Sequence, residues 1–244
     1  MTDKPVALVT GSSSGIGAAI ARRMSAEGMA VVVNSVRSVA AGEKLAASLP
    51  DAAFVRADVS DEAEAQHLVE RVVAEYGRLD LLVNNAGVTK PIPHADLTAA
   101  TGEVWRTILG LNVIGTWQTT VAATPWLRRS PGGGHVVNIS SVAGTRPAGS
   151  SIPYAVSKAA VDHMTRLLAG ALGPDVRVNA VAPGLIDTPW TQGFTEIRNR
   201  VEATTPLRRV GTPEDVAEVV AGLQRAAYTT GEVVLVDGGA HLLI

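Results

Sequence analysis

The sequence alternates short, apolar, β-branched runs with longer segments of helical period, and this alternation most constrains the fold. Several runs, such as Val6–Thr10 and Ala30–Asn34, are almost entirely apolar, as expected for strands buried on both faces. This alternation is typical of a parallel sheet covered by helices on both faces. The predicted strands are Val6–Thr10, Ala30–Asn34, Ala53–Ala57, Leu79–Asn84, His135–Ser140, Val176–Val181 and Val233–Val236.

Amphipathic stretches between these strands predict six helices, at residues 15–28, 39–49, 61–76, 100–129, 153–172 and 213–225. Seven strands and six helices form one continuous doubly wound α/β unit, so residues 1–244 are interpreted as a single domain. Residues 187–211 do not fit the alternation. Because connections this long in compact domains are usually functional, this segment is interpreted as a substrate-binding loop region.

The composition excludes several kinds of site. The chain has no cysteine, which excludes disulfides, thiolate metal sites and cysteine nucleophiles. Its five histidines lack metal-ligand spacing, so no metal is expected. The formal net charge of −2 gives no reason to expect nucleic acid or membrane as a partner. Without a signal-like segment or an apolar run of ~18–20 residues, a cytoplasmic location is expected.

The first predicted strand leads directly into a glycine-rich loop. Glycines permit a tight turn and close backbone approach, and free amides at the following helix start complement phosphate charge. In a first βαβ unit such a loop predicts a dinucleotide site, although an ordinary strand-to-helix turn is the alternative. The spacing is G-x-x-x-G-x-G rather than G-x-G-x-x-G. The candidate residues are Gly11, Ser12, Ser13, Ser14, Gly15, Ile16 and Gly17.

Tyr154 and Lys158 are four residues apart on a predicted helix, so their side chains project from the same face. Carbonyl reduction requires a proton at the oxygen, but a tyrosine with a pKa of ~10 is a poor acid–base group near neutrality. A cation held nearby stabilises the phenolate and lowers that pKa. The pair therefore suits proton transfer, although the same spacing also occurs on ordinary exposed helices.

Three motifs together resemble those of the short-chain dehydrogenase/reductase family: the T-G-x-x-x-G-x-G loop, Asn84-Asn85-Ala86-Gly87 and Tyr154-x-x-x-Lys158. The resemblance extends from residue 5 to Val236-Asp237-Gly238-Gly239. It implies a Rossmann-like fold and an NAD(P)H-dependent oxidoreductase. The chain is most similar to the 3-oxoacyl-carrier-protein reductases and related ketoreductases, whose substrates are small-molecule ketones, free or carrier-bound. The alternatives are an alcohol, sugar or steroid dehydrogenase and a non-catalytic dinucleotide-binding scaffold.

The resemblance implies four catalytic residues, Asn112, Ser141, Tyr154 and Lys158. Tyr154 would donate the proton, Ser141 would bind the substrate oxygen, and Lys158 would also bind the nicotinamide ribose. Asn112 would kink its helix and hold a water that relays protons through Lys158, although a satisfied core amide is the alternative. Ser140 is a rival to Ser141, and the family's Ser-to-Tyr spacing selects Ser141.

The resemblance also implies cofactor contacts outside the glycine loop. Asp58 and Val59 match the pair that brackets the adenine, although Asp58 could instead be an acid that precedes a helix. Residues 85–87 lie along the adenosine ribose in relatives, and the segment after the sixth strand holds the carboxamide. The candidate residues are Asp58, Val59, Asn85, Ala86, Gly87, Tyr154, Lys158, Pro183, Gly184, Ile186 and Thr188.

The end of the second predicted strand favours NADPH over NADH, although NAD remains possible. NAD-specific sites place an acid there, but no acid lies between Glu27 and Glu43. Arg37 offers a planar donor group suited to a 2′-phosphate, and the hydroxyls of residues 12, 14 and 38 could add donors. Many NADP-dependent relatives carry a basic residue where Ser14 stands, so an expected second cation is missing. Arg37 could also be an ordinary solvated residue.

Relatives usually assemble as homotetramers through helices of the 100–129 and 153–172 segments, so a homotetramer is expected. The first of these segments contains Trp105, Trp117 and Trp126, which are interpreted as packing residues. Trp190 opens the long loop, where it either lines the substrate site or anchors the loop.

Overall fold

Seven parallel strands form one sheet in the order β3-β2-β1-β4-β5-β6-β7, in a computed structural model that describes residues 2–243. Every neighbouring pair is parallel. This confirms the predicted Rossmann-like, doubly wound α/β class. The strands are β1 (Val6–Val9), β2 (Ala30–Ser35), β3 (Ala52–Arg56), β4 (Leu81–Asn84), β5 (Gly134–Ile139), β6 (Val176–Pro183) and β7 (Val233–Val236).

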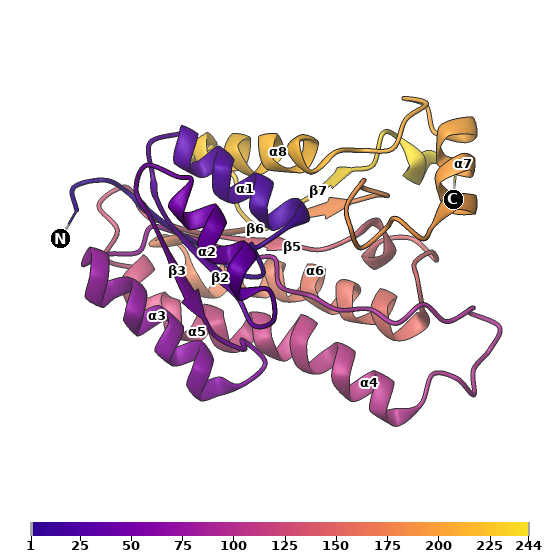
Figure 1. Cartoon of the computed structure of the whole chain (residues 1–244), viewed down its shortest axis with the longest axis horizontal. Helices are drawn as coiled ribbons and strands as arrows, with labels where there is room; N and C mark the ends of the chain where they lie inside the picture. The colour runs from indigo at the N-terminus through magenta and orange to yellow at the C-terminus, as the bar shows by residue number, and fades with distance from the viewer. Residues whose placement is uncertain (1, 244) are drawn as a thin grey trace.

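Helices cover both faces of the sheet (Figure 1). One face carries α1 (Gly15–Ala26), α2 (Val39–Ala47) and α8 (Pro213–Arg225), and the other carries α3 (Glu62–Tyr76), α5 (Thr116–Leu127) and α6 (Ile152–Leu172). Alternate residues of β1 enter the two cores: Ala7 and Val9 pack on the α1 side, and Val6 and Leu8 on the α3 side. Burial on both faces explains why the strands are apolar without alternation.

The structure differs from the predicted elements in two places. The segment expected as one helix over 100–129 is α4 (Gly102–Leu109), a π-helical segment η1 (Gly110–Gly115) and α5. Residues 187–211 were expected to be a loop, but they include α7 (Thr195–Thr204). No described residue of α7 is buried, so this helix lacks the apolar stripe on which periodicity depends.

The carboxyl ends of the strands lie along one edge of the sheet, because all strands run in the same direction. The chain reverses its direction of strand addition between β1 and β4, and open α/β sheets bind ligands at such a switch point. The glycine loop, the segment after β4 and the segment after β6 all lie at this edge. Within residues 2–243, no helix is long and apolar enough to cross a membrane.

Candidate active site

The glycine loop is shaped by close backbone contacts. Gly11 and Gly15 have φ values of 60° and 53°, which L side chains rarely adopt. A Cβ atom on Gly17 would lie 2.5 Å from Asn85 Nδ2 and 2.7 Å from the Gly11 carbonyl oxygen. In the described chain, the side chain of Ser14 does not cap α1. The backbone amides of the first turn of α1 are therefore free to donate hydrogen bonds to a phosphate.

Two buried polar side chains hold this loop against the sheet. Asn34 accepts from the Gly11 amide at 3.2 Å and donates to two carbonyls of the β3 segment. Ser12 is fully buried, and its hydroxyl donates to the Val9 carbonyl at 2.6 Å. In this conformation the Ser12 hydroxyl donates within the protein, so a contact from this hydroxyl to a phosphate would come only after its rotation. Asn34 was not predicted as a site residue, although a polar residue that ends an apolar strand is a usable signal.

The segment after β4 packs directly on the glycine loop. The Thr10 hydroxyl accepts from the amides of Asn85 and Ala86 at 3.0 and 3.1 Å. The Asn85 side chain donates to the carbonyls of Thr10 and Gly11, both at 2.9 Å. A Cβ atom on Gly11 would lie 2.8 Å from the Ala86 Cα. These contacts bring together the two segments that the sequence assigned to the cofactor.

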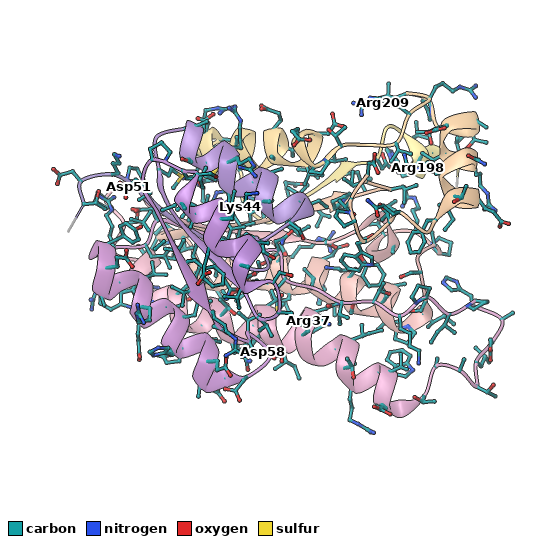
Figure 2. All side chains as sticks on the ribbon, in the orientation of Figure 1. Arg37, Lys44, Asp51, Asp58, Arg198 and Arg209 are labelled. Carbon is teal, nitrogen blue, oxygen red and sulfur yellow. The ribbon has the colours of Figure 1, made fainter. Side chains whose placement is uncertain are left out.

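One expected and one unexpected cation lie near the carboxyl end of β2. Arg37 is exposed and lies at the carboxyl edge of the sheet (Figure 2). The β2–β3 register pairs Ser35 with Arg56, and Arg56 Nε donates to the Val36 carbonyl at 3.3 Å. Arg56 was not predicted from the sequence, because its position beside the end of β2 depends on strand order. The strand neighbour thus supplies a second cation on this side of the glycine loop.

Asp58 and Val59 begin the connection from β3 to α3. The Asp58 carboxylate accepts from the Ser60 amide at 2.9 Å and from its hydroxyl at 2.6 Å. These are the contacts of the alternative interpretation, in which Asp58 shapes the approach to a helix. The Val59 carbonyl accepts from Gln118 Nε2 at 2.7 Å, which ties this connection to α5.

Asn112 lies in the π-helical segment η1, where the family resemblance implied a kinked helix. Its Oδ1 accepts from the Val88 amide at 2.8 Å. Its Nδ2 donates to the Val88 carbonyl at 3.0 Å and to Ser157 Oγ at 2.9 Å. A Cβ atom on Gly87 would lie 3.4 Å from Asn112 Oδ1 and 3.8 Å from Lys158 Nζ. Asn112 is thus a satisfied buried amide beside the lysine.

Lys158 and Tyr154 share one face of α6. Lys158 is 5% exposed, and its Nζ donates to the Ile139 carbonyl at 2.8 Å. Nζ lies 5.7 Å from the centre of the Tyr154 ring. Burial lowers the pKa of Lys158 to about 8, and the charge of Asp162 opposes this shift. Burial raises the pKa of Tyr154, and a hydrogen bond with Ser141 opposes that increase.

The two neighbouring serines after β5 point to different partners. Ser140 is buried, and its hydroxyl donates to the Lys158 carbonyl at 3.2 Å. Ser141 is half-buried and accepts from the Ala143 amide at 3.2 Å, so its hydroxyl proton can be donated to Tyr154 or to a substrate oxygen. The proximity of Ser141 to Tyr154 favours Ser141 over Ser140 as the residue that faces a substrate oxygen.

The segment after β6 packs against the glycine loop. A Cβ atom on Gly15 would lie 3.3 Å from Thr188 Cγ2, and one on Gly184 would lie 2.8 Å from Asp237 Cβ. Pro183 is the last residue of β6, and Ile186 bridges to Gly211. This segment therefore faces the glycine loop.

Two contacts hold the first part of the 187–211 segment in place. Arg198 projects from α7 (Figure 2), and its Nη2 lies 2.5 Å from Asp187 Oδ1. Trp190 is 49% exposed and packs edge to face on Tyr154, with ring centres 6.3 Å apart. Of the two interpretations of Trp190, this contact favours a place beside the reacting groups.

Comparisons with known proteins agree with this geometry. The family model "Enoyl-(Acyl carrier protein) reductase" matches residues 11–241. The chain is 70% identical over 244 residues to a provisionally named ketoacyl reductase 2 of the granaticin polyketide synthase from Streptomyces violaceoruber, covering 99% of this chain and 98% of that protein. It is 38% identical to a 3-oxoacyl-[acyl-carrier-protein] reductase from Thermotoga maritima, covering 96% of each. The chain belongs to the short-chain dehydrogenase/reductase family.

A solved structure gives the same result for the fold. A provisionally assigned short-chain dehydrogenase/reductase from Burkholderia xenovorans superposes with a TM-score of 0.93 at 36% identity, covering all of both chains. The chain is therefore an oxidoreductase of this family, whose members use nicotinamide dinucleotides. The uncapped start of α1 fits such a group, because it presents free amides to a phosphate, and the glycine loop holds these amides close against the neighbouring segments.

Proposed function

We propose that this chain is an NADPH-dependent ketoreductase that reduces a 3-oxoacyl thioester or a polyketide-like ketone. The observation that carries the proposal is the convergence of Ser141, Tyr154 and the buried Lys158 at the carboxyl edge of the sheet. The names of the two curated relatives, both reductases of ketoacyl groups, support a carbonyl substrate. The family model's description names an enoyl reductase, so the substrate test must include a carbon–carbon double bond.

In the proposed mechanism the Ser141 hydroxyl donates a hydrogen bond to the substrate carbonyl oxygen. The dinucleotide supplies the hydride. Tyr154 transfers its phenol proton to the oxygen as negative charge develops there, and the Lys158 ammonium group stabilises the resulting phenolate. Asn112 holds Val88 through both its amide atoms, so it positions the wall of the site next to Lys158. A water held near Asn112 would return the proton through Lys158.

We propose that the dinucleotide lies across the glycine loop, the 85–87 segment and the segment after β6. The first backbone amides of α1 would donate to its pyrophosphate, Lys158 would donate to its ribose hydroxyls, and Ile186 and Thr188 would hold its carboxamide. Arg37 and Arg56 flank the end of β2 and together favour a 2′-phosphate, which selects NADPH. The Ser14 and Ser38 hydroxyls remain candidate donors. NAD binds more weakly in this proposal.

The 187–211 segment forms the proposed wall of the substrate pocket. Trp190 lies beside Tyr154 and is half exposed, so it offers an aromatic surface to a bulky ketone. Arg198 holds α7 to Asp187, which positions this wall. A flat aromatic surface suits a large, unsaturated substrate better than a small alcohol.

We further propose a homotetramer that works in the cytoplasm. Trp117 and Val121 are half exposed on α5, and Val156 and Leu167 are exposed on α6. Trp117 was interpreted from the sequence as a packing residue; it is half exposed in the single chain and would pack in this interface. Exposed apolar groups on two adjacent helices are typical of a subunit interface. Sedimentation of the purified protein tests this assembly.

The function is tested by following NADPH oxidation against a substrate panel. The panel contains 3-oxoacyl thioesters, aromatic polyketide-like ketones, an enoyl thioester, and simple sugars and alcohols with the oxidised dinucleotide. We expect turnover of ketoacyl thioesters or polyketide-like ketones and little reduction of the enoyl thioester. Efficient oxidation of a sugar or alcohol without detectable ketone reduction would instead support a dehydrogenase. Cofactor binding without any turnover would support the non-catalytic alternative.

A further inference from the structure

Asp162 is a buried acid that the proposed mechanism does not use. It lies one helical turn beyond Lys158 and two turns beyond Tyr154, so all three occupy one face of α6. Asp162 is 2% exposed, and within residues 2–243 neither of its carboxylate oxygens has a hydrogen-bond partner. Burying a carboxyl group without partners is costly. Its position in the core therefore calls for a compensating interaction.

The short helix η2 (Val142–Gly144) encloses this carboxylate. A Cβ atom on Gly144 would lie 2.6 Å from Asp162 Oδ2 and 2.8 Å from the backbone carbon of Lys158. A side chain at position 144 is therefore incompatible with the observed place of the carboxylate. Because Gly144 lacks that atom, η2 packs closely on α6 and excludes water from Asp162.

Few groups near Asp162 can compensate its charge. From β5, the Ser140 hydroxyl is near enough to lower its pKa, but in the structure it donates to the Lys158 carbonyl. From α6 itself, Arg166 is exposed, and its Nη1 donates to the main-chain carbonyl of Asp162 at 3.3 Å. η2 faces the carboxylate with the backbone of Gly144. Arg166 also lowers the pKa of Asp162, but its side chain is exposed to solvent. Among the described residues, Lys158 is a buried cation on the same helix face, beyond ion-pair distance of the carboxylate, and charges act most strongly in such a low-dielectric environment.

Lys158 and Asp162 each affect the pKa of the other. Burial raises the pKa of Asp162, and Ser140, Arg166 and Lys158 lower it. Burial lowers the pKa of Lys158 to about 8, while Asp162 raises it. The Nζ of Lys158 donates to one carbonyl, that of Ile139, and this neutral acceptor compensates the cation only in part. An anion in the same core therefore helps the lysine to stay protonated.

We propose that Asp162 is the buried counter-charge of Lys158, a positioning residue that keeps the ammonium group charged beside Tyr154. Asp162 acts through Lys158 and does not touch the substrate. The inference rests on the proposed roles of Tyr154 and Lys158 in ketone reduction, and it assigns to α6 a third polar residue with a defined task. Gly144 belongs to the same arrangement, because it makes room for the carboxylate.

The test replaces the charge and keeps the shape, with Asp162→Asn. The chain has four lysines, and Lys4, Lys44 and Lys90 are exposed, so Lys158 is distinguishable by NMR of ¹³C-labelled lysine. In the ligand-free variant we expect the Lys158 pKa to fall by about one unit or more, as for loss of a nearby opposite charge. The alkaline limit of kcat for ketone reduction should move down by a similar amount.

Asp175→Asn is the matched control, because Asp175 is exposed just after α6 and its removal changes the net charge equally. This control should leave the Lys158 titration and the pH profile unchanged. A folded Asp162→Asn protein with the wild-type Lys158 titration would overturn the proposal. A movement of both readouts in the variant alone would support it.

A wild-type measurement covers the case in which Asp162→Asn does not fold. The ¹³C-carboxyl signal of Asp162 reports its ionisation directly. An ionised carboxylate at neutral pH supports the proposal, and a neutral carboxyl group overturns it. The lysine titration requires no substrate, so it tests Asp162 even if the panel shows no ketone reduction. Failure of the counter-charge and failure of the ketoreductase function are therefore separate outcomes.

Discussion

The rings of Tyr154 and Trp190 pack edge to face, with centres 6.3 Å apart and planes inclined at 76°. Tyr154 lies on α6, whereas Trp190 belongs to the segment that follows β6. The contact thus joins the proposed proton donor to the proposed substrate wall. Because about half of the Trp190 surface remains exposed, this side chain can contact a substrate while it supports the tyrosine.

Trp190→Ala should weaken the binding of a bulky ketone more than it slows the chemical step. Loss of the aromatic surface should raise KM by roughly tenfold, equivalent to about 1.4 kcal/mol, while kcat changes less. Trp190→Phe should recover most of the loss, because it keeps an aromatic ring. Steady-state kinetics with a small and a bulky ketone measure the effect. An unchanged KM for the bulky ketone would assign Trp190 to loop anchoring.

Tyr154→Phe should remove most turnover and leave the fold and dinucleotide binding nearly intact. The substitution deletes the hydroxyl proposed as the proton donor, and general acid–base groups contribute ~10²–10⁴ in rate. Tyr228→Phe is the matched control, because Tyr228 is fully exposed and should retain full activity. Single-turnover rates and fluorescence titration with NADPH measure the two effects. A variant that keeps more than about half of wild-type kcat contradicts the assignment.

The rate of ketone reduction should decrease as the pH rises through about 8. Burial lowers the pKa of Lys158 to about 8, against the opposing charge of Asp162. The ammonium group is charged below that pH and neutral above it, so its stabilisation of the phenolate is lost on the alkaline side. The pKa of Tyr154 is raised by burial, so the phenol stays protonated over the same range. A profile of kcat at saturating NADPH checks this, and constant activity well above this pH would contradict it.

The fold was predictable because its main signal is local. Strands such as β1 and β2 are apolar throughout, and glycine after β1 marks the turn into α1. The helix α7 was not predictable in this way, since its residues are exposed and carry no apolar period. The family resemblance implied a kink at Asn112, but the π-helical form of η1 and the bonds from Asn112 to Val88 were not predictable from local sequence patterns.

The site was predictable only where its residues are close in sequence. The spacing of Tyr154 and Lys158 already places them on one helix face. Arg56 could not be found in this way, because its neighbour Ser35 lies on another strand and the pairing follows from the sheet order. The same holds for Trp190 and Tyr154, which meet through the loop after β6. Asp162 follows the helical spacing, but its significance depends on burial.

Arg37→Ala should weaken NADPH binding and leave NADH binding nearly unchanged. Arg37 is exposed at the end of β2, where the proposed 2′-phosphate lies, and hydrogen bonds to charged groups contribute ~1.5–3 kcal/mol. NADPH affinity should therefore fall by roughly 10- to 100-fold. Titrations of wild type and variant with both cofactors measure the difference. Equal losses for NADPH and NADH, or a wild type that prefers NADH, would contradict the NADPH assignment.

Arg56→Ala tests whether the neighbouring strand supplies a second cation. Arg56 Nε is held by the Val36 carbonyl, so its remaining nitrogens can face the same phosphate as Arg37. We expect a smaller loss of NADPH affinity than in Arg37→Ala, and a combined loss in the double variant that exceeds either single loss. Arg225→Ala is the control. Arg225 is an exposed arginine at the end of α8 that pairs with Glu27 after α1, away from the carboxyl ends of the strands. If Arg56→Ala leaves the NADPH affinity unchanged, Arg37 alone carries the selectivity.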